Sequence, residues 1–174
     1  GRPWEAPDGA VCATLGAMSP LLGHPLPAFS LQDDQGTVVT AKDLKGRWTV
    51  LYAYPKDSTP GCTTEACDFR DNLARVQAQG AQVYGISRDS LKSHTNFIAK
   101  QNLPFRLLSD PELALLKPLG AFGRKVMYGK EVEGIIRSTF LVDPKGIIRH
   151  VWPKVSVKGH VADVLETLAG MQKG

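Results

Sequence analysis

Long hydrophobic runs, abundant cysteine and a strong charge imbalance are all missing from this chain of 174 residues. No apolar run comes near the roughly 18 residues of a membrane span, so we expect no membrane association. Three cysteines do not form the disulfide framework of a small secreted protein, and they lack zinc-site spacing with the four histidines. A net charge of +4 from scattered lysines and arginines gives no reason to expect a nucleic-acid partner.

The remaining composition is that of an ordinary globular protein. Hydrophobic residues make up 43% of the chain and charged residues 22%. A single domain of this length buries about 70% of the surface exposed by the unfolded chain, so it needs no disulfide for stability. A reducing compartment is therefore expected, and a close pair of cysteines there is more often catalytic than structural.

Residues 1–17 differ in character from the rest of the chain. They contain neither a basic region nor a long apolar stretch, so they do not resemble a secretory signal. Met18 is a candidate native start. We expect residues 1–17 to be an expression-derived or disordered tail and residues 18–174 to form one domain. The alternative is a native tail that carries Cys12 as a third thiol.

Hydrophobic patterns predict strands that alternate with helices. A hairpin is expected at residues 29–40, and the nearly continuous apolar run at 48–54 predicts a central strand covered on both faces. Further strands are expected at 82–87, 105–108, 134–142 and 146–152, and helices at 63–79, 91–101, 111–119 and 159–169. This order predicts an α/β layered domain.

Two cysteines lie where a proline-rich loop leads into the first long helix, Cys62 at the junction and Cys67 within the predicted helix. Cys62 is at the helix start, where unpaired N–H groups and the helix dipole favour a thiolate. Full ionisation of a thiol of pKa about 8.5 gains only about 2 kcal/mol, whereas enzymes typically need about 8 kcal/mol or more. The site must also hold and polarise a substrate. Candidate donors are Thr59, the N–H groups of Gly61 and Cys62, and a distant cation.

The spacing of Cys62 and Cys67 predicts a conformational change. Residues five apart in an intact helix have Cα atoms about 8.7 Å apart, whereas a disulfide needs less than about 7 Å. The two cysteines can join only if the first turns unwind. Thr63 and Thr64 are mediocre helix formers that lower the cost of unwinding. We therefore expect a reduced folded form and an oxidised, locally melted form.

The motif Pro55-x-x-x-Thr59-x-x-Cys62 resembles the signature of the peroxiredoxins. The longer run at residues 54–71 is similar to the subgroup called bacterioferritin comigratory protein or peroxiredoxin Q. The similarity covers roughly residues 20–170 and continues through Ser93-His94, residues 103–110, residues 134–143 and Gly159-His160.

This resemblance implies a thioredoxin-like fold, with a central mixed sheet flanked by helices and an N-terminal β-hairpin, and reduction of hydrogen peroxide and organic hydroperoxides. It implies that Cys62 is the peroxidatic cysteine, which becomes a sulfenic acid. Cys67 matches the resolving cysteine, which forms an intramolecular disulfide with it. Thr59 matches the hydroxyl that holds the peroxide, Pro55 the shield of the sulfur, and Arg137 the cation that stabilises developing charge.

The same resemblance implies the partners and the setting. Thioredoxin or a related dithiol protein is expected to reduce the disulfide by exchange. No metal or organic cofactor is implied. A monomer in the bacterial cytoplasm, with a role in antioxidant defence and redox homeostasis, is the expected form.

The cysteines and the loop residues each have a simpler interpretation. Cys62 would then be an inert buried thiol, and Cys67 would be packing in the core. Thr59 and Pro55 would be ordinary turn residues. At the level of the whole protein, the alternatives are a disulfide oxidoreductase or redox-binding module without fast peroxidase activity, and a non-catalytic interaction domain.

Charged and ionisable residues also leave alternatives open. Arg137 would be part of a structural ion pair in a predicted strand. Glu65 either positions Arg137 or only satisfies the helix dipole. For His94 and His160, packing or capping is favoured over acid–base chemistry.

Overall fold

The computed structural model describes residues 19–173 and contains a seven-stranded mixed sheet of order β2-β1-β5-β4-β3-β8-β9. Strand β3 pairs in parallel with β4 and antiparallel with β8. The strands are β1 (Ser30–Asp33), β2 (Val38–Thr40), β3 (Trp48–Ala53), β4 (Ala81–Ser87), β5 (Arg106–Ser109), β8 (Ser138–Val142) and β9 (Ile148–Trp152). The predicted mixed sheet and the N-terminal β-hairpin are confirmed.

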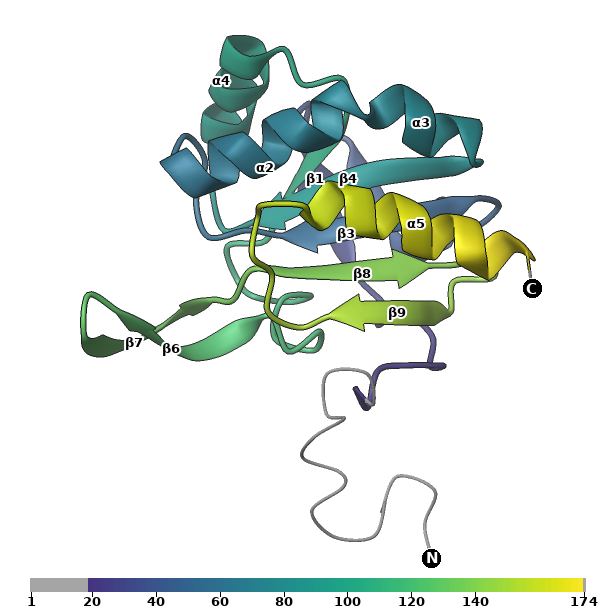
Figure 1. Cartoon of the computed structure of the whole chain (residues 1–174). Helices are drawn as coiled ribbons and strands as arrows, with labels where there is room; N and C mark the ends of the chain where they lie inside the picture. Colours follow the sequence, from purple (N-terminus) through teal and green to yellow (C-terminus); the bar gives the residue numbers. More distant parts are fainter. Residues whose placement is uncertain (1–18, 174) are drawn as a thin grey trace, which may run out of the picture.

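Within the described residues, four α-helices and one short 3₁₀ helix accompany the sheet (Figure 1). They are η1 (Ala41–Leu44), α2 (Pro60–Asp71), α3 (Leu73–Ala78), α4 (Leu91–Gln101) and α5 (His160–Lys173). Helices α2 to α5 contribute buried residues such as Phe69, Phe97 and Val164 to a single core cluster with Val50 and Tyr52 of β3. No helix within residues 19–173 is long and apolar enough to cross a membrane.

A second core covers the opposite face of the sheet. Leu51 and Ala53, which alternate along β3 with the residues of the first core, pack there with Leu115 and Leu116 from the segment after β5. Strand β3 is therefore covered on both faces, as its apolar sequence predicts. The expected tail at residues 1–17, with Cys12, lies outside the described residues.

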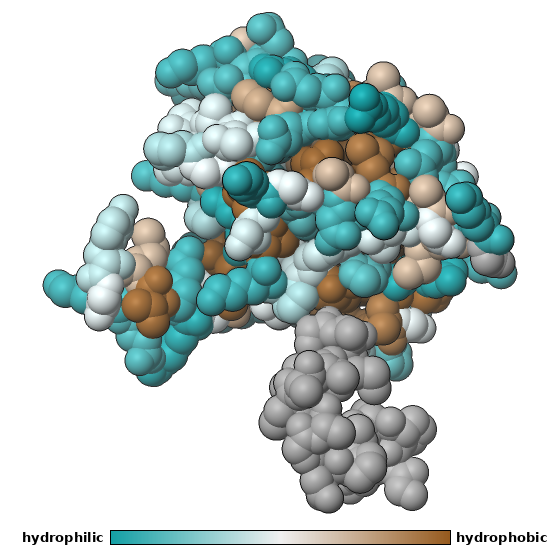
Figure 2. Space-filling view, viewed as in Figure 1, coloured by the Kyte–Doolittle hydropathy of each residue, from teal (hydrophilic) through white to brown (hydrophobic). Residues whose placement is uncertain are grey.

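The prediction of one continuous strand at residues 134–142 is wrong, because this segment contains the end of one strand and the whole of another, and the two belong to different sheets. Strands β6 (Phe122–Met127) and β7 (Lys130–Ile135) form a two-stranded hairpin that projects from the body (Figure 1). Strand β6 was not predicted. The hairpin tip carries an exposed apolar patch, with Val126 72% and Tyr128 97% exposed (Figure 2). Arg137 lies in the two-residue link between β7 and β8.

The predicted helix at residues 63–79 begins earlier and is interrupted. Helix α2 starts at Pro60, whose fixed φ suits the first helical position. It ends at Asp71, and the next residue, Asn72, has ψ 7° and a side-chain amide that donates to the carbonyl of Asp68 at 2.8 Å. Local bonds of this kind compete with helix continuation. The second part of the predicted helix is the separate helix α3.

The predicted helix at residues 111–119 is also wrong, since this segment forms successive turns. The carboxylate of Asp110 is fully buried and accepts hydrogen bonds from the N–H groups of three residues. These donors are Ala114, Leu115 and Leu116, at 2.7, 2.9 and 2.8 Å. A side chain that gathers three N–H groups replaces the carbonyl acceptors of a helix.

Asp110→Ala tests this explanation through stability. The substitution leaves three N–H groups without an acceptor, two of them buried, and we expect the free energy of unfolding to fall by about 3 kcal/mol. Urea unfolding of the reduced protein measures the change. The control is Glu112→Ala, an exposed neighbour that should change stability by less than about 0.5 kcal/mol. Equal effects of the two substitutions would contradict the role of Asp110.

Candidate active site

Cys62 occupies the first turn of α2, at the end of the sheet where β3 stops. Thr59 is the N-cap residue and Pro60 the first helical residue. This start leaves the N–H groups of Gly61 and Cys62 without acceptors inside the helix. The Cys62 side chain is only 1% exposed. A thiolate at this position is stabilised by the helix dipole while it is shielded from bulk water.

Arg137 connects the thiol to a buried carboxylate. Its Nη2 donates to Cys62 Sγ at 3.3 Å, and its Nη1 donates to Glu65 Oε1 at 2.6 Å. Glu65 is fully buried, whereas the Arg137 side chain is 17% exposed. Among the expected roles of Glu65, contact with Arg137 is the one that the structure supports.

Gly61 provides the space that this arrangement needs. A Cβ atom at position 61 would lie 3.1 Å from Arg137 Nη2, closer than side chains ordinarily allow. A larger residue at position 61 would therefore require the guanidinium to shift by a few tenths of an ångström.

Burial is the largest influence on the pKa values of Glu65 and Arg137. It raises the pKa of the Glu65 carboxyl to about 7, although Arg137 acts in the opposite direction. Burial also opposes the charge of Arg137, but Glu65 and Cys62 outweigh it and raise the guanidinium pKa. Arg137 thus stays charged and offers one donor to sulfur and one to carboxylate.

Thr59 and Pro55 line the same cavity as Cys62 and Arg137. The cavity has a volume of about 590 Å³ and extends under the β6–β7 hairpin. The Thr59 hydroxyl donates to the carbonyl of Lys56 at 2.8 Å, which leaves its oxygen free to accept a hydrogen bond. The structure therefore brings Pro55, Thr59, Gly61, Cys62 and Arg137 together around one cavity, whereas Glu65 is reached only through Arg137 and Cys67 does not line the cavity.

Lys125 is a cavity residue that was not predicted from the sequence. Its Nζ donates to the carbonyl of Ile135 at 2.6 Å across the hairpin. A Cβ at Gly134 would lie 3.2 Å from Lys125 Cε, so this glycine gives the side chain its path. Burial and the charge of Arg137 lower the Lys125 pKa, against an opposing effect of Cys62. The sequence of β6, Phe-Gly-Arg-Lys-Val-Met, does not alternate between apolar and polar residues, so it gave no strand signal from which Lys125 could have been placed.

Cys67 lies one and a half turns further along α2. It is half-buried, and its Sγ contacts Gln101 Oε1 of α4 at 3.5 Å. Both thiols are free. Helix α2 is continuous from Pro60 to Asp71, so the two Cα atoms are separated by about 8.7 Å of helix geometry. The structure is the reduced, folded form.

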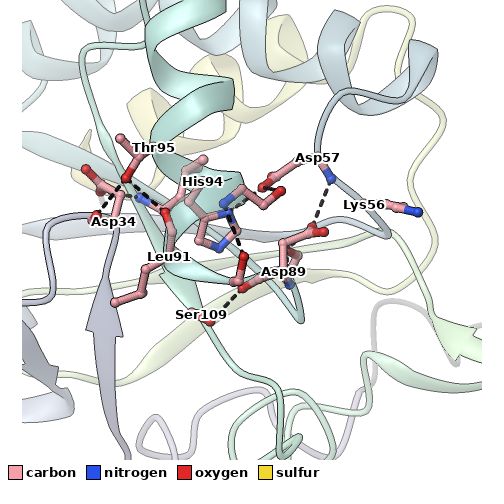
Figure 3. Close-up of polar contacts among 12 residues, drawn as sticks. Asp34, Lys56, Asp57, Asp89, Leu91, His94, Thr95 and Ser109 are labelled. Atoms are coloured by element: carbon pink, nitrogen blue, oxygen red, sulfur yellow. Dashed lines mark hydrogen bonds and ion pairs between the residues drawn. The ribbon is translucent and has the colours of Figure 1, made fainter.

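His94 and His160 are both buried, and both make hydrogen bonds inside the protein. His160 Nε2 contacts the Thr139 hydroxyl at 2.8 Å, and burial lowers the His160 pKa to about 4. His94 contacts Asp57 at 2.7 Å (Figure 3). These contacts support the packing interpretation over direct acid–base chemistry on substrate.

Glu65→Gln tests the raised pKa of Glu65. A carboxyl whose pKa rises from 4.5 to about 7 on folding binds a proton more tightly in the folded state. The wild type should therefore lose stability relative to the variant as the pH rises from about 4.5 to about 7, by up to about 3 kcal/mol. Urea unfolding of both reduced proteins at about pH 5 and about pH 8 measures this difference. A difference that does not change with pH would contradict the raised pKa.

Comparison with known proteins identifies the family. The AhpC/TSA family model matches residues 22–151. A putative peroxiredoxin bcp of Coxiella burnetii is 48% identical over 151 residues, which cover 87% of this chain and 100% of that protein. The peroxiredoxin Bcp of Bacillus subtilis is 47% identical over 152 residues, which cover 87% and 97%.

Solved structures agree with the sequence relatives. The Xanthomonas campestris bacterioferritin comigratory protein superposes with a TM-score of 0.78 at 47% identity and covers 82% of this chain and 91% of its own. A cysteine-to-serine mutant of Xanthomonas campestris peroxiredoxin Q gives a TM-score of 0.80 at 45% identity, with coverage of 90% and 99%. The chain therefore belongs to the AhpC/TSA family and is a peroxiredoxin of the Bcp or peroxiredoxin Q type, a thiol-dependent peroxidase.

Proposed function

We propose that Cys62 is the peroxidatic cysteine of this peroxidase and that Cys67 resolves its oxidised form. The observation that carries the proposal is the Arg137 bridge, which places one cation within hydrogen-bond reach of the buried sulfur. A structural ion pair between Arg137 and Glu65 alone would not require the second guanidinium nitrogen to face a thiol.

In the first step, the Cys62 thiolate attacks the terminal oxygen of the hydroperoxide. The S–O bond forms as the O–O bond breaks, the sulfur is oxidised to a sulfenic acid, and the leaving oxygen takes a proton to become water or an alcohol. Negative charge moves from sulfur to the leaving oxygen. Arg137 and the N–H groups of the helix start are donors aimed at this charge, and the Thr59 oxygen accepts from the peroxide.

In the second step, the Cys67 sulfur attacks the sulfur of the Cys62 sulfenic acid. The S–S bond forms as the S–O bond breaks, and the hydroxide leaves as water with the proton of the Cys67 thiol. The helix separation of about 8.7 Å exceeds the disulfide limit of about 7 Å. The first turns of α2 must therefore unwind. This movement also breaks the Arg137 contact, so the step converts an active, ordered turn into an inactive, open one.

Organic hydroperoxides are proposed substrates together with hydrogen peroxide. The volume of about 590 Å³ is far larger than hydrogen peroxide requires, and Phe122, Met127 and Val132 supply apolar surface on the hairpin side. The Xanthomonas campestris relative is described by its alkyl peroxide reduction activity.

Thioredoxin or a related dithiol protein is the proposed reductant. It would attack the Cys62–Cys67 disulfide by thiol–disulfide exchange and return both thiols. Because both cysteines lie on one helix, the cycle needs no second subunit, which supports a monomer. The bacterial cytoplasm, where such reductants keep thiols reduced, is the proposed location.

Cysteine variants test the two assignments separately. Peroxide consumption is measured with thioredoxin, thioredoxin reductase and NADPH. Cys62→Ser should abolish turnover, since no sulfenic acid can form. Cys67→Ser should still react once with peroxide but lose most thioredoxin-dependent turnover. Peroxidase activity in Cys62→Ser would overturn the central assignment, whereas full turnover in Cys67→Ser would overturn only the resolving role. Dithiol exchange without peroxide consumption would instead indicate a disulfide oxidoreductase.

Amide hydrogen exchange tests the unwinding. The N–H groups of residues 63–67 should exchange faster in the peroxide-oxidised protein than in the reduced protein, because their helical hydrogen bonds, which begin with that of Thr63 to the Thr59 carbonyl, are lost. Helix α5 is the internal control and should change little. Equal exchange rates over residues 63–67 in the two forms would contradict the predicted conformational change.

A further inference from the structure

A buried polar network connects the loop between β3 and α2 to α4 and to the segment after β4 (Figure 3). At its centre is Asp57, which is 5% exposed. Its carboxylate accepts from the Tyr54 hydroxyl at 2.5 Å, from the Ser93 hydroxyl at 2.8 Å and from His94 Nδ1 at 2.7 Å. The Asp57 N–H donates to Asp89 Oδ2 at 2.9 Å.

His94 is positioned to carry both ring protons. Its Nδ1 faces the Asp57 carboxylate, and its Nε2 faces the carbonyl of Leu108 at 2.9 Å. Both partners only accept, so each ring nitrogen has a satisfied hydrogen bond only if it donates. The ring is fully buried. A neutral imidazole would leave one buried pair unsatisfied, whereas the imidazolium satisfies both and offsets the charge of Asp57.

Hydrogen bonding argues against a metal ion here. The ligand-type atoms of Asp57, Asp89 and His94 lie within 4.8 Å of one another. Those of Asp57 and His94 are occupied as described, and Asp89 Oδ2 accepts from the Ser87 hydroxyl at 2.6 Å as well as from Asp57. A network in which these atoms already have donors or acceptors is complete without an ion.

The network acts on the loop that carries two active-site residues. Asp57 lies between Pro55, which lines the cavity beside Cys62, and Thr59, the N-cap of the helix. The next residue, Ser58, has φ 63°, a left-handed conformation that non-glycine residues adopt only when their surroundings impose it. The hydrogen bonds of Asp57 to Tyr54, to α4 and to the segment after β4 impose it here.

We propose that Asp57 and His94 are positioning residues for peroxide reduction: their buried ion pair holds residues 55–59 in the reactive arrangement while the helix turn after them unwinds and reforms. Neither residue touches substrate. Their function is to keep Pro55 and Thr59 in place while the first turns of α2, which directly follow Thr59, unwind and reform in each cycle.

This positioning role rests on the proposed peroxidase cycle of Cys62. The hydrogen-bonded loop and the helix turn that must unwind in the proposed cycle meet at Thr59, which also donates to the Lys56 carbonyl inside the loop. Without an anchor before this point, unwinding of α2 would extend backwards into the peroxide-binding loop. A misplacement of only about 1 Å in an active site can cost about 100-fold in rate.

The test compares the rate of Cys62 oxidation in Asp57→Asn, His94→Asn and wild type, by rapid mixing of the reduced proteins with hydrogen peroxide well below their melting temperatures. Each variant should lower the second-order rate constant about tenfold or more. The double variant should lose less than the product of the two single losses, because both substitutions remove the same pair. Rates within twofold of wild type in folded single variants would overturn the proposal.

Asp143→Asn is the matched control. Asp143 is also a buried carboxylate with backbone donors and an arginine partner, but it lies just after β8, at the end of the sheet away from Cys62. This variant should lose stability yet keep a Cys62 oxidation rate within about twofold of wild type. An equal loss of rate in Asp143→Asn would show that general destabilisation explains the effect and would overturn the proposal.

Nuclear magnetic resonance provides a readout that stability alone does not change. The His94 ring should show two slowly exchanging N–H protons in the wild type at neutral pH and one in Asp57→Asn. A single ring N–H proton in the wild type would contradict the ion pair. If the wild type itself consumed no peroxide, the proposed peroxidase function would be wrong. If the wild type were active and the variants were equally active, only the positioning role of Asp57 and His94 would be wrong.

Milder variants serve if the aspartate and histidine variants do not fold. Tyr54→Phe and Ser93→Ala each remove one donor to the Asp57 carboxylate and leave the ion pair in place. Each should lower the Cys62 oxidation rate about two- to fivefold, in line with the loss of one hydrogen bond. Unchanged rates in both would overturn the proposal.

Discussion

The contact of Arg137 with both Cys62 and Glu65 is the interaction on which the active site depends. It joins the link between two strands to the first two turns of α2. A carboxylate as fully buried as Glu65 is costly without a partner, and the guanidinium that donates to its Oε1 also faces the sulfur, while Glu65 Oε2 has no hydrogen-bond partner among the described residues. Burial nevertheless raises the Glu65 pKa, so the ionised carboxylate gains solvation when its turn unwinds. The group that orders the reduced site thus also lowers the cost of opening it.

Most of the fold was predictable where local signals and tertiary packing agree. Helix α4 has the predicted bounds because Ser90 caps its start by accepting from the Ser93 N–H and Asn102 ends it in a left-handed conformation. The prediction failed after β5 because Asp110 takes the N–H groups that a helix would use. It also failed at residues 134–142, where an apolar sequence passes from the hairpin to the main sheet and strand structure is interrupted at Ile136 and Arg137. Neither event has a local signature.

The site was predictable to a different extent for each residue. The peroxiredoxin resemblance located Cys62 and Arg137, but only the three-dimensional structure shows that 75 residues of separation become a 3.3 Å contact. Glu65 had two open interpretations, and its full burial against Arg137 favours positioning. Lys125 was missed because its hairpin was not predicted. Asp57 was missed because a single acid in a loop does not indicate a partner such as His94, 37 positions away.

The central claim is that Cys62 works in a folded helix turn and meets Cys67 only after that turn is lost. The most direct test is a crystal structure of the peroxide-oxidised protein. We expect a Cys62–Cys67 disulfide, loss of helical hydrogen bonds at the start of α2, and separation of Arg137 from the sulfur. A disulfide between these cysteines with the helix still intact from Pro60, or an oxidised protein in which Cys67 remains a free thiol, would contradict this claim.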